Sequence, residues 1–241
     1  MEHQNPDQAP AAATVTGDDD ARKFMTWVFV WMFFALAISS ACIYAFNTFD
    51  YCSNLLFVKD TPTALFYIAL IGPFILSFII RKRINGISYA GLCILFVIYA
   101  ALVGTCFSFI LVIFTDSPTL AIFLAACLAF GLMAVIGFFT KTDLTQTRPI
   151  LTFMLAGLVF VAPLVFLFPR LDMSFWFSLA GVVVFLGLSA FHFQDLSDTA
   201  DGIDMNDPSA KKMAILCSLS LYVDFVNLFI FLVRMFIRTK D

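Results

Sequence analysis

The sequence has very few charged residues for its length. Only 13% of its 241 residues are Asp, Glu, Lys or Arg, whereas a typical soluble domain contains about 25%. A chain with so little charge would expose large apolar patches in water and would aggregate. The low charge therefore excludes an ordinary soluble globular domain.

Several motifs that would indicate a catalytic, metal or nucleic-acid function are also missing. The net charge is −3, and no basic patch with interleaved aromatic residues predicts binding to nucleic acid. The six cysteines stand singly, without Cys-x-x-Cys or Cys/His spacing, so we predict no metal site, cofactor or disulfide framework. There is no His-Glu-x-x-His motif, no Ser/His dyad signal and no second intramembrane acid that would form an aspartyl-protease pair. We therefore do not expect an enzyme.

The N-terminus lacks the basic segment that precedes the apolar core of a signal peptide. The acidic triplet Asp18-Asp19-Asp20 precedes the first apolar run instead. Residues 1–21 are rich in Ala, Pro, Gln and Asp, a composition typical of disorder. We predict a disordered tail over residues 1–21 and a membrane domain over residues 22–241.

Apolar residues dominate the rest of the chain, at 61% of the sequence. They form seven runs of a length that crosses a bilayer as a helix, which takes about 20 residues. The sequence therefore predicts an all-α integral membrane protein with seven transmembrane helices in the lipid bilayer. The runs are Phe24–Phe46, Thr63–Ile80, Ile87–Phe114, Leu120–Phe139, Ile150–Phe168, about 172–193 and Met213–Ile237.

The distribution of Lys and Arg predicts the orientation. With the N-terminus in the cytoplasm, nine of the 14 basic residues lie in cytoplasmic segments and five on the other side, as the positive-inside rule requires. Seven spans place the C-terminus outside, whereas six spans with a re-entrant last segment would return it inside. We expect a bacterial plasma membrane, or an intracellular membrane in a eukaryote, and either a monomer or an oligomer.

One carboxylate stands inside an apolar run. Of the 17 acidic residues, only Asp224 lies well within a span; the others lie in tails, loops or span ends. It is eleven residues past Met213, which at about 1.5 Å per residue places it near mid-bilayer. A charge there costs about 2.5–3.5 kcal/mol on insertion scales, so Asp224 is a candidate functional residue.

His192 is the second ionisable candidate, in the sixth run. Gly202 is a plausible C-terminal cap for its helix, and Asp207-Pro208 predicts the start of the next one. Counted from these ends, Asp224 lies about six residues further along the helix axis than His192, an offset of roughly 9 Å. Whether the two side chains touch is therefore left open by the sequence. If they meet, they titrate as a coupled pair. Otherwise His192 donates a hydrogen bond to a backbone carbonyl and Asp224 caps a neighbouring helix.

The connection between the last two runs is acidic. Asp195, Asp198, Asp201, Asp204 and Asp207 recur every third residue, a spacing that does not match an EF-hand loop. The segment is interpreted either as a solvated loop or as a means of concentrating cations at a pore mouth.

The last span resembles a known family. Leu221–Phe229 reads LYVDFVNLF and is followed by Leu232-Val233-Arg234, which is similar to the final motif of the Bax inhibitor-1 (transmembrane Bax inhibitor motif) family. Two weaker matches lie upstream in the same order, Tyr99–Gly104 with Ser108 and Thr140–Leu144. The resemblance covers residues from about 22 to 236.

The resemblance implies a last helix that is central and wrapped by the other six. It also implies a pH-sensitive calcium leak channel gated by two facing aspartates in the sixth and seventh helices. Asp224 matches the second of these, while the stretch Phe191–Gln194 places His192 at the first, with Asp195 one turn further on as the other candidate. Arg81 matches a basic residue that pairs with the aspartates in the family.

The expected gate and ion pathway therefore comprise Asp224, His192, Asp195, Arg81 and Asn227, with calcium and protons as the moving ions. A His/Asp pair attracts when both members are charged, unlike two aspartates, so its pH response is expected to be weaker or reversed. It also offers calcium one oxygen ligand fewer. The alternative is a membrane scaffold or a stress and cell-death regulator that acts through partner proteins without ion flux.

Overall fold

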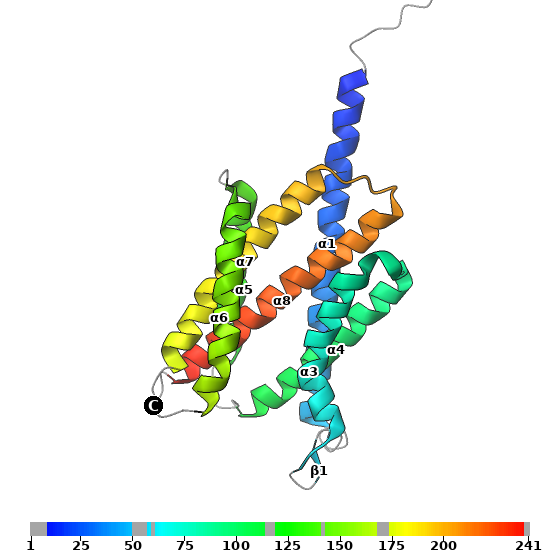
Figure 1. Cartoon of the computed structure of the whole chain (residues 1–241). Helices are drawn as coiled ribbons and strands as arrows, with labels where there is room; N and C mark the ends of the chain where they lie inside the picture. Colours follow the sequence, from blue (N-terminus) through cyan, green and yellow to red (C-terminus); the bar gives the residue numbers. More distant parts are fainter. Residues whose placement is uncertain are drawn as a thin grey trace, which may run out of the picture.

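The computed structural model describes residues 9–49, 57–58, 61–113, 119–140, 143–167 and 174–238. Within these ranges the fold is helical, and the predicted all-α membrane fold is confirmed. Six helices are long and apolar enough to cross a bilayer, and Ala125–Phe139 forms a shorter apolar segment of a seventh. The seven long helices are α1 (Ala9–Thr48), α3 (Ala64–Arg83), α4 (Tyr89–Ile113), α5 (Thr119–Phe139), α6 (Arg148–Leu167), α7 (Ser174–Asp201) and α8 (Pro208–Arg238) (Figure 1).

The described connections contain only short elements. The 3-10 turns η1 (Ile84–Gly86) and η2 (Leu144–Thr147) follow α3 and precede α6, respectively. The two-residue strands β1 (Phe57–Val58) and β2 (Thr61–Pro62) pair antiparallel between α1 and α3.

Large apolar side chains cover the outside of the bundle. Phe74 on α3 and Phe153 and Phe160 on α6 are all more than three-quarters exposed. In water such a surface would drive aggregation, but in lipid it contacts chains that are as apolar as the protein interior. The exposed phenylalanines therefore mark the lipid-facing side of the protein.

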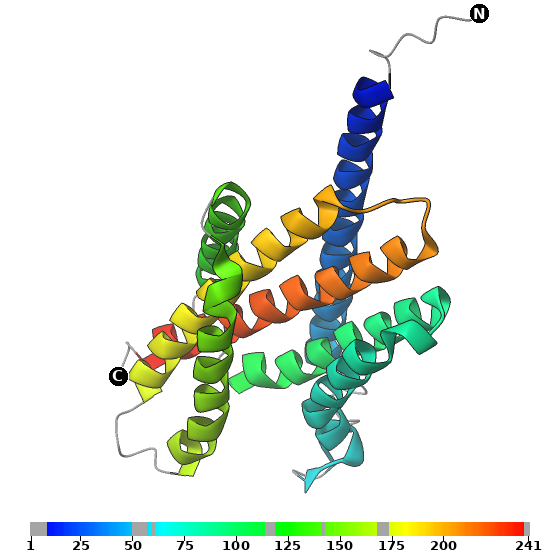
Figure 2. The same cartoon turned by 45° about the horizontal axis from the view of Figure 1, so that its top comes forward.

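The last helix is central, as predicted. α8 packs against α7, α1, α5, α4 and α3, whereas α6 packs mainly on α7. Figures 1 and 2 show α7 and α8 running side by side across the middle, with α1, α3 and α4 on one side and α5 and α6 on the other. A residue near the middle of α8 is thus surrounded by protein and not by lipid.

α8 is one continuous helix that starts at Pro208 and ends at Arg238. It runs antiparallel to α7 and finishes at the opposite end of the bundle from its start (Figure 1). A single unbroken helix of this length favours a full crossing of the membrane by the last segment over a re-entrant one.

α1 starts at Ala9, inside the segment that we predict to be a tail, and its first turns project beyond the neighbouring helices in both views. The alanines at positions 11–13 have the highest helix propensity, and a helix already nucleated by the membrane span extends at little cost. Asp20 accepts a long hydrogen bond of 3.4 Å from the Met205 amide, so this end of α1 lies beside the α7–α8 connection. Residues 1–8 of the predicted tail lie outside the described residues.

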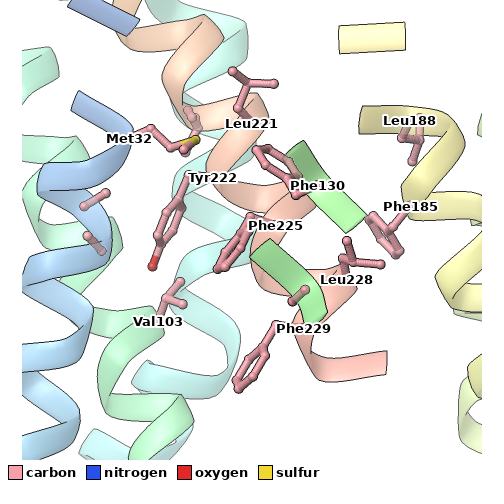
Figure 3. Packing of buried hydrophobic residues seen from close by; sticks show 14 of the residues in the cluster. Met32, Val103, Phe130, Phe185, Leu188, Leu221, Tyr222, Phe225, Leu228 and Phe229 are labelled. Carbon is pink, nitrogen blue, oxygen red and sulfur yellow. The ribbon is translucent and has the colours of Figure 1, made fainter. Parts of the chain in front are cut away.

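The core forms around one face of α8. Tyr222, Phe225, Leu228 and Phe229 point into the spaces between α8 and its neighbours (Figure 3). The residues that surround them come from four helices, namely Met32 of α1, Val103 of α4, Phe130 of α5, and Phe185 and Leu188 of α7.

A buried hydroxyl pair joins α1, α4 and α8 within this core. Ser39 Oγ lies 2.6 Å from the Tyr222 hydroxyl and 2.8 Å from the Ala100 carbonyl oxygen. Tyr99 stacks edge-on against Tyr222, and Gly104 lies directly against Ser39. The upstream motif that begins at Tyr99 therefore packs against the final motif of α8.

We expect Ser39→Ala to destabilise the protein more than Tyr222→Phe does. Tyr222→Phe leaves Ser39 its carbonyl acceptors, so the loss is that of one hydrogen bond, about 1 kcal/mol. Ser39→Ala leaves the fully buried Tyr222 hydroxyl without its partner, which costs about 1–3 kcal/mol. Thermal unfolding in detergent measures both, and a greater loss for Tyr222→Phe would contradict this assignment.

Candidate functional site

The side-by-side packing of α7 and α8 brings the two predicted ionisable residues into direct contact. His192 Nδ1 lies 2.6 Å from Asp224 Oδ2. A separation this short places the two side chains in direct hydrogen-bond contact. The contact that the sequence leaves open is therefore present, and it joins α7 to α8 through His192 and Asp224.

The connection between the helices removes the axial offset that the sequence leaves open. Figure 1 shows the chain continuing beyond the end of α7 before α8 begins. α8 therefore starts further out than α7 ends, and the extra turns of α8 bring Asp224 level with His192. Asp207 Oδ1 accepts the Ser209 amide at 2.8 Å, as the predicted N-cap requires, and this bond lowers the pKa of the Asp207 carboxyl.

The pair is largely withdrawn from solvent. The Asp224 residue is 3% exposed, and the His192 side chain is 21% exposed. Burial of one ionisable group is costly unless a partner accompanies it, and His192 is that partner here. The pair therefore ties α7 to α8 at the level of the core.

Arg81, at the end of α3, brings a positive charge towards the pair. Its Nη2 donates to Ser220 Oγ at 3.1 Å, one turn before Asp224 on α8. Its charge acts electrostatically on Asp224, although no direct ion pair joins the two among the described residues. Ionisable groups from α3, α7 and α8 thus lie near one another.

The other two predicted residues lie apart from the direct contact. Asp195 is exposed one turn after His192, and within the described ranges it has no hydrogen bond or ion pair with Asp224. Asn227 Nδ2 donates to the Val223 carbonyl of its own helix at 2.8 Å. Of the two candidates for the first gate position, His192 is the one that touches Asp224.

Gln194 is a residue of the site that the sequence did not predict. Its Oε1 accepts the Leu144 amide at 2.7 Å, and its Nε2 donates to the Thr140 carbonyl at 3.4 Å. These bonds join the two matched stretches Phe191–Gln194 and Thr140–Leu144, which lie about fifty residues apart in the chain. Both stretches match the family motifs, but a single sequence does not show that the two stretches contact each other.

Carboxylate oxygens in the acidic connection accept hydrogen bonds from nearby backbone amides. Asp204 Oδ1 accepts the Asn206 amide at 2.9 Å, in addition to the cap formed by Asp207. Among the described residues, no group of three or more His, Cys, Asp or Glu side chains is arranged to hold a metal ion. A resident metal is therefore not assigned to the described part of this segment.

Comparison with known proteins supports a family assignment for almost the whole chain. Residues 21–241 match the family described as "Inhibitor of apoptosis-promoting Bax1". The chain is 32% identical over 218 residues to the inner membrane protein YbhL of Escherichia coli K12, covering 89% of this chain and 91% of the relative. An uncharacterized protein of Deinococcus radiodurans is 34% identical over 218 residues, covering 90% of each chain.

A third relative, an uncharacterized protein of Borreliella burgdorferi, is 31% identical over 212 residues, covering 88% of this chain and 90% of the relative. The central α8 and the position of Asp224 on it agree with what the final motif implies. The chain belongs to the Bax inhibitor-1 family of multi-pass integral membrane proteins.

Proposed function

We propose that this protein is a pH-sensitive calcium leak channel gated by protonation at the His192–Asp224 pair. The observation that carries the proposal is the contact of 2.6 Å between these two side chains at the centre of the helix bundle. A titratable contact between the two central helices couples their packing to the proton concentration.

The proposed gate depends on the protonation states in which His192 and Asp224 hold α7 against α8. While Asp224 is ionised, the imidazole donates an N–H to it in either the neutral or the charged form. When Asp224 is protonated, an imidazolium no longer faces a carboxylate, and the attraction between α7 and α8 is lost. Arg81 donates to Ser220 one turn away, so its positive charge lies near the same part of α8.

Polar residues of α8 provide a route for a cation. Ser220, Asp224 and Asn227 follow one another at spacings of four and three residues, which places them on one face of the helix. Oxygen ligands of this kind suit calcium. The exposed carboxylates around Asp195 raise the cation concentration at the end of the pathway.

The membrane and orientation form part of the same proposal. The relative from Escherichia coli is named as an inner membrane protein, and we place this chain in a bacterial inner membrane. With the N-terminus in the cytoplasm, the basic segments after α3 and α5 and the α7–α8 connection face the cytoplasm.

Calcium flux into liposomes that contain a calcium dye tests the function. Wild-type protein should pass calcium faster as the pH falls, and Asp224→Asn should remove that dependence because residue 224 no longer titrates. Asp19→Asn is the matched control, since Asp19 is exposed near the start of the first span. Flux no greater than that of empty liposomes at every pH would exclude the channel.

The competing function is a scaffold or stress regulator without flux, in which the pair only holds α7 against α8. The same contact favours it, because breaking a buried pair destabilises a helix interface. It predicts that Asp224→Asn lowers the unfolding temperature in detergent while the liposomes never pass calcium.

A further inference from the structure

Four consecutive residues of α7 each contact a different part of the bundle. Phe191 lies under the Arg148 guanidinium at the start of α6, at 5.6 Å, and His192 contacts Asp224 of α8. Phe193 is fully buried against Phe130 of α5, with ring centroids 5.0 Å apart. Gln194 completes the set by bonding the connection between α5 and α6.

α7 has little room to move at this level. A Cβ built on Gly137 of α5 would lie 2.5 Å from the Ala190 carbonyl oxygen and 2.6 Å from Phe193 Cβ. The two backbones are therefore in close contact immediately before the His192–Asp224 pair. This packing sets the distance between α5 and α7, and a hydrogen bond to α7 adds a directional restraint on the height and rotation of the helix.

Gln194 supplies a hydrogen-bonded restraint on α7. Its amide bonds two backbone groups that flank residues 141–142, the Thr140 carbonyl and the Leu144 amide. A side-chain amide that binds a donor and an acceptor on one segment fixes both the height and the rotation of its own helix. His192 is two residues away on the same helix, so its ring position follows from this restraint.

We propose that Gln194 is the positioning residue of the pair, which holds α7 in register with the α5–α6 connection so that His192 Nδ1 meets Asp224. A role of Gln194 in gating rests on the proposed function. Its role in positioning His192 against Asp224 does not. Coupling of this kind is reciprocal. A substitution at Asp224 should therefore weaken the hydrogen bond of the Leu144 amide, and the loss of Gln194 should displace the His192 ring.

The charged and titratable groups near the pair come from several elements. The charge of Arg81 on α3 acts on Asp224. Cys217 of α8 lies near the charges of both Asp195 and Arg81. Arg148 of α6 covers the ring of Phe191, next to His192. Gln194 carries no charge. Its replacement by an uncharged residue therefore changes the pair only through geometry.

The test uses full-length protein in nanodiscs and the imidazole NMR signal of His192. The chain has only two histidines, so a His3→Gln background isolates this signal. Gln194→Met keeps the length of the side chain but loses both hydrogen bonds. We expect it to change the imidazole ¹⁵N chemical shifts of His192 at a fixed pH, because the bond from Nδ1 to Asp224 is altered, while Gln146→Met, at an exposed amide in the same connection, leaves these shifts unchanged.

Hydrogen exchange at the Leu144 amide supplies the reciprocal measurement. Asp224→Asn should accelerate exchange of the Leu144 amide several-fold, and Gln194→Glu, which keeps an oxygen acceptor, should preserve the protection. Unchanged His192 ¹⁵N chemical shifts in folded Gln194→Met overturn the proposal. So does a Leu144 amide that is indifferent to Asp224→Asn.

These outcomes are separable from the function itself. If the His192 signal and the Leu144 amide respond but wild-type liposomes pass no calcium, the positioning role stands and the channel fails. If the liposomes leak with a pH dependence that Gln194→Met does not alter, and the His192 signal is unchanged, the channel stands and the positioning role fails.

Discussion

His192→Ala is expected to destabilise the protein by about 3 kcal/mol, because removing one partner of a buried ionic pair leaves the other uncompensated. Asp224, which is 3% exposed and bonded to His192, would have to be protonated or rehydrated within the bundle. Unfolding in detergent at about pH 8 measures the loss under conditions in which protonating an ordinary carboxylate is most costly.

A double-mutant cycle shows whether the loss belongs to the pair. With Asp224→Asn already in place, His192→Ala should cost much less than it does alone, since no carboxylate is left unpaired. Replacing both residues with leucine should recover most of the stability, because apolar replacement of a buried pair is often neutral or better. Equal costs of His192→Ala in the two backgrounds would show that the contact carries no coupling energy.

Gly104→Val is expected to cost about 3 kcal/mol, at the upper end for overpacking a core. A Cβ at position 104 would lie 2.6 Å from both the Cα and the carbonyl oxygen of Ser39. These are backbone atoms, which cannot rotate away, so α1 and α4 must separate. The separation would also break the bond from Ser39 to the Ala100 carbonyl.

Gly131→Val is the matched control on α5. Gly131 is exposed and has no neighbouring atoms within 4 Å of a built Cβ. Both changes replace a helical glycine with the same side chain, so only the close approach differs between them. Thermal unfolding should therefore show a large loss for Gly104→Val and almost none for Gly131→Val; similar losses would contradict the packing argument.

The sequence predicted the helices well because lipid leaves few alternatives. In a bilayer every backbone polar group must be satisfied within its own segment, so each long apolar run forms a helix. The start of α8 was predicted closely by Asp207-Pro208 for a similar reason, since a cap acts within a few residues. By contrast, the start of α1 at Ala9 was not predicted, because composition does not show how far a helix extends into water.

For the candidate site, the sequence determined which residues are costly and which family the chain resembles. Asp224 stands out by its charge alone, whatever surrounds it. Only the tertiary structure decided that His192, and not Asp195, contacts it, and that Gln194 bonds the Thr140 and Leu144 backbone. The physical reason is that these contacts depend on the stagger between helices, which the α7–α8 connection and the packing of α5 on α7 set and which no local pattern records.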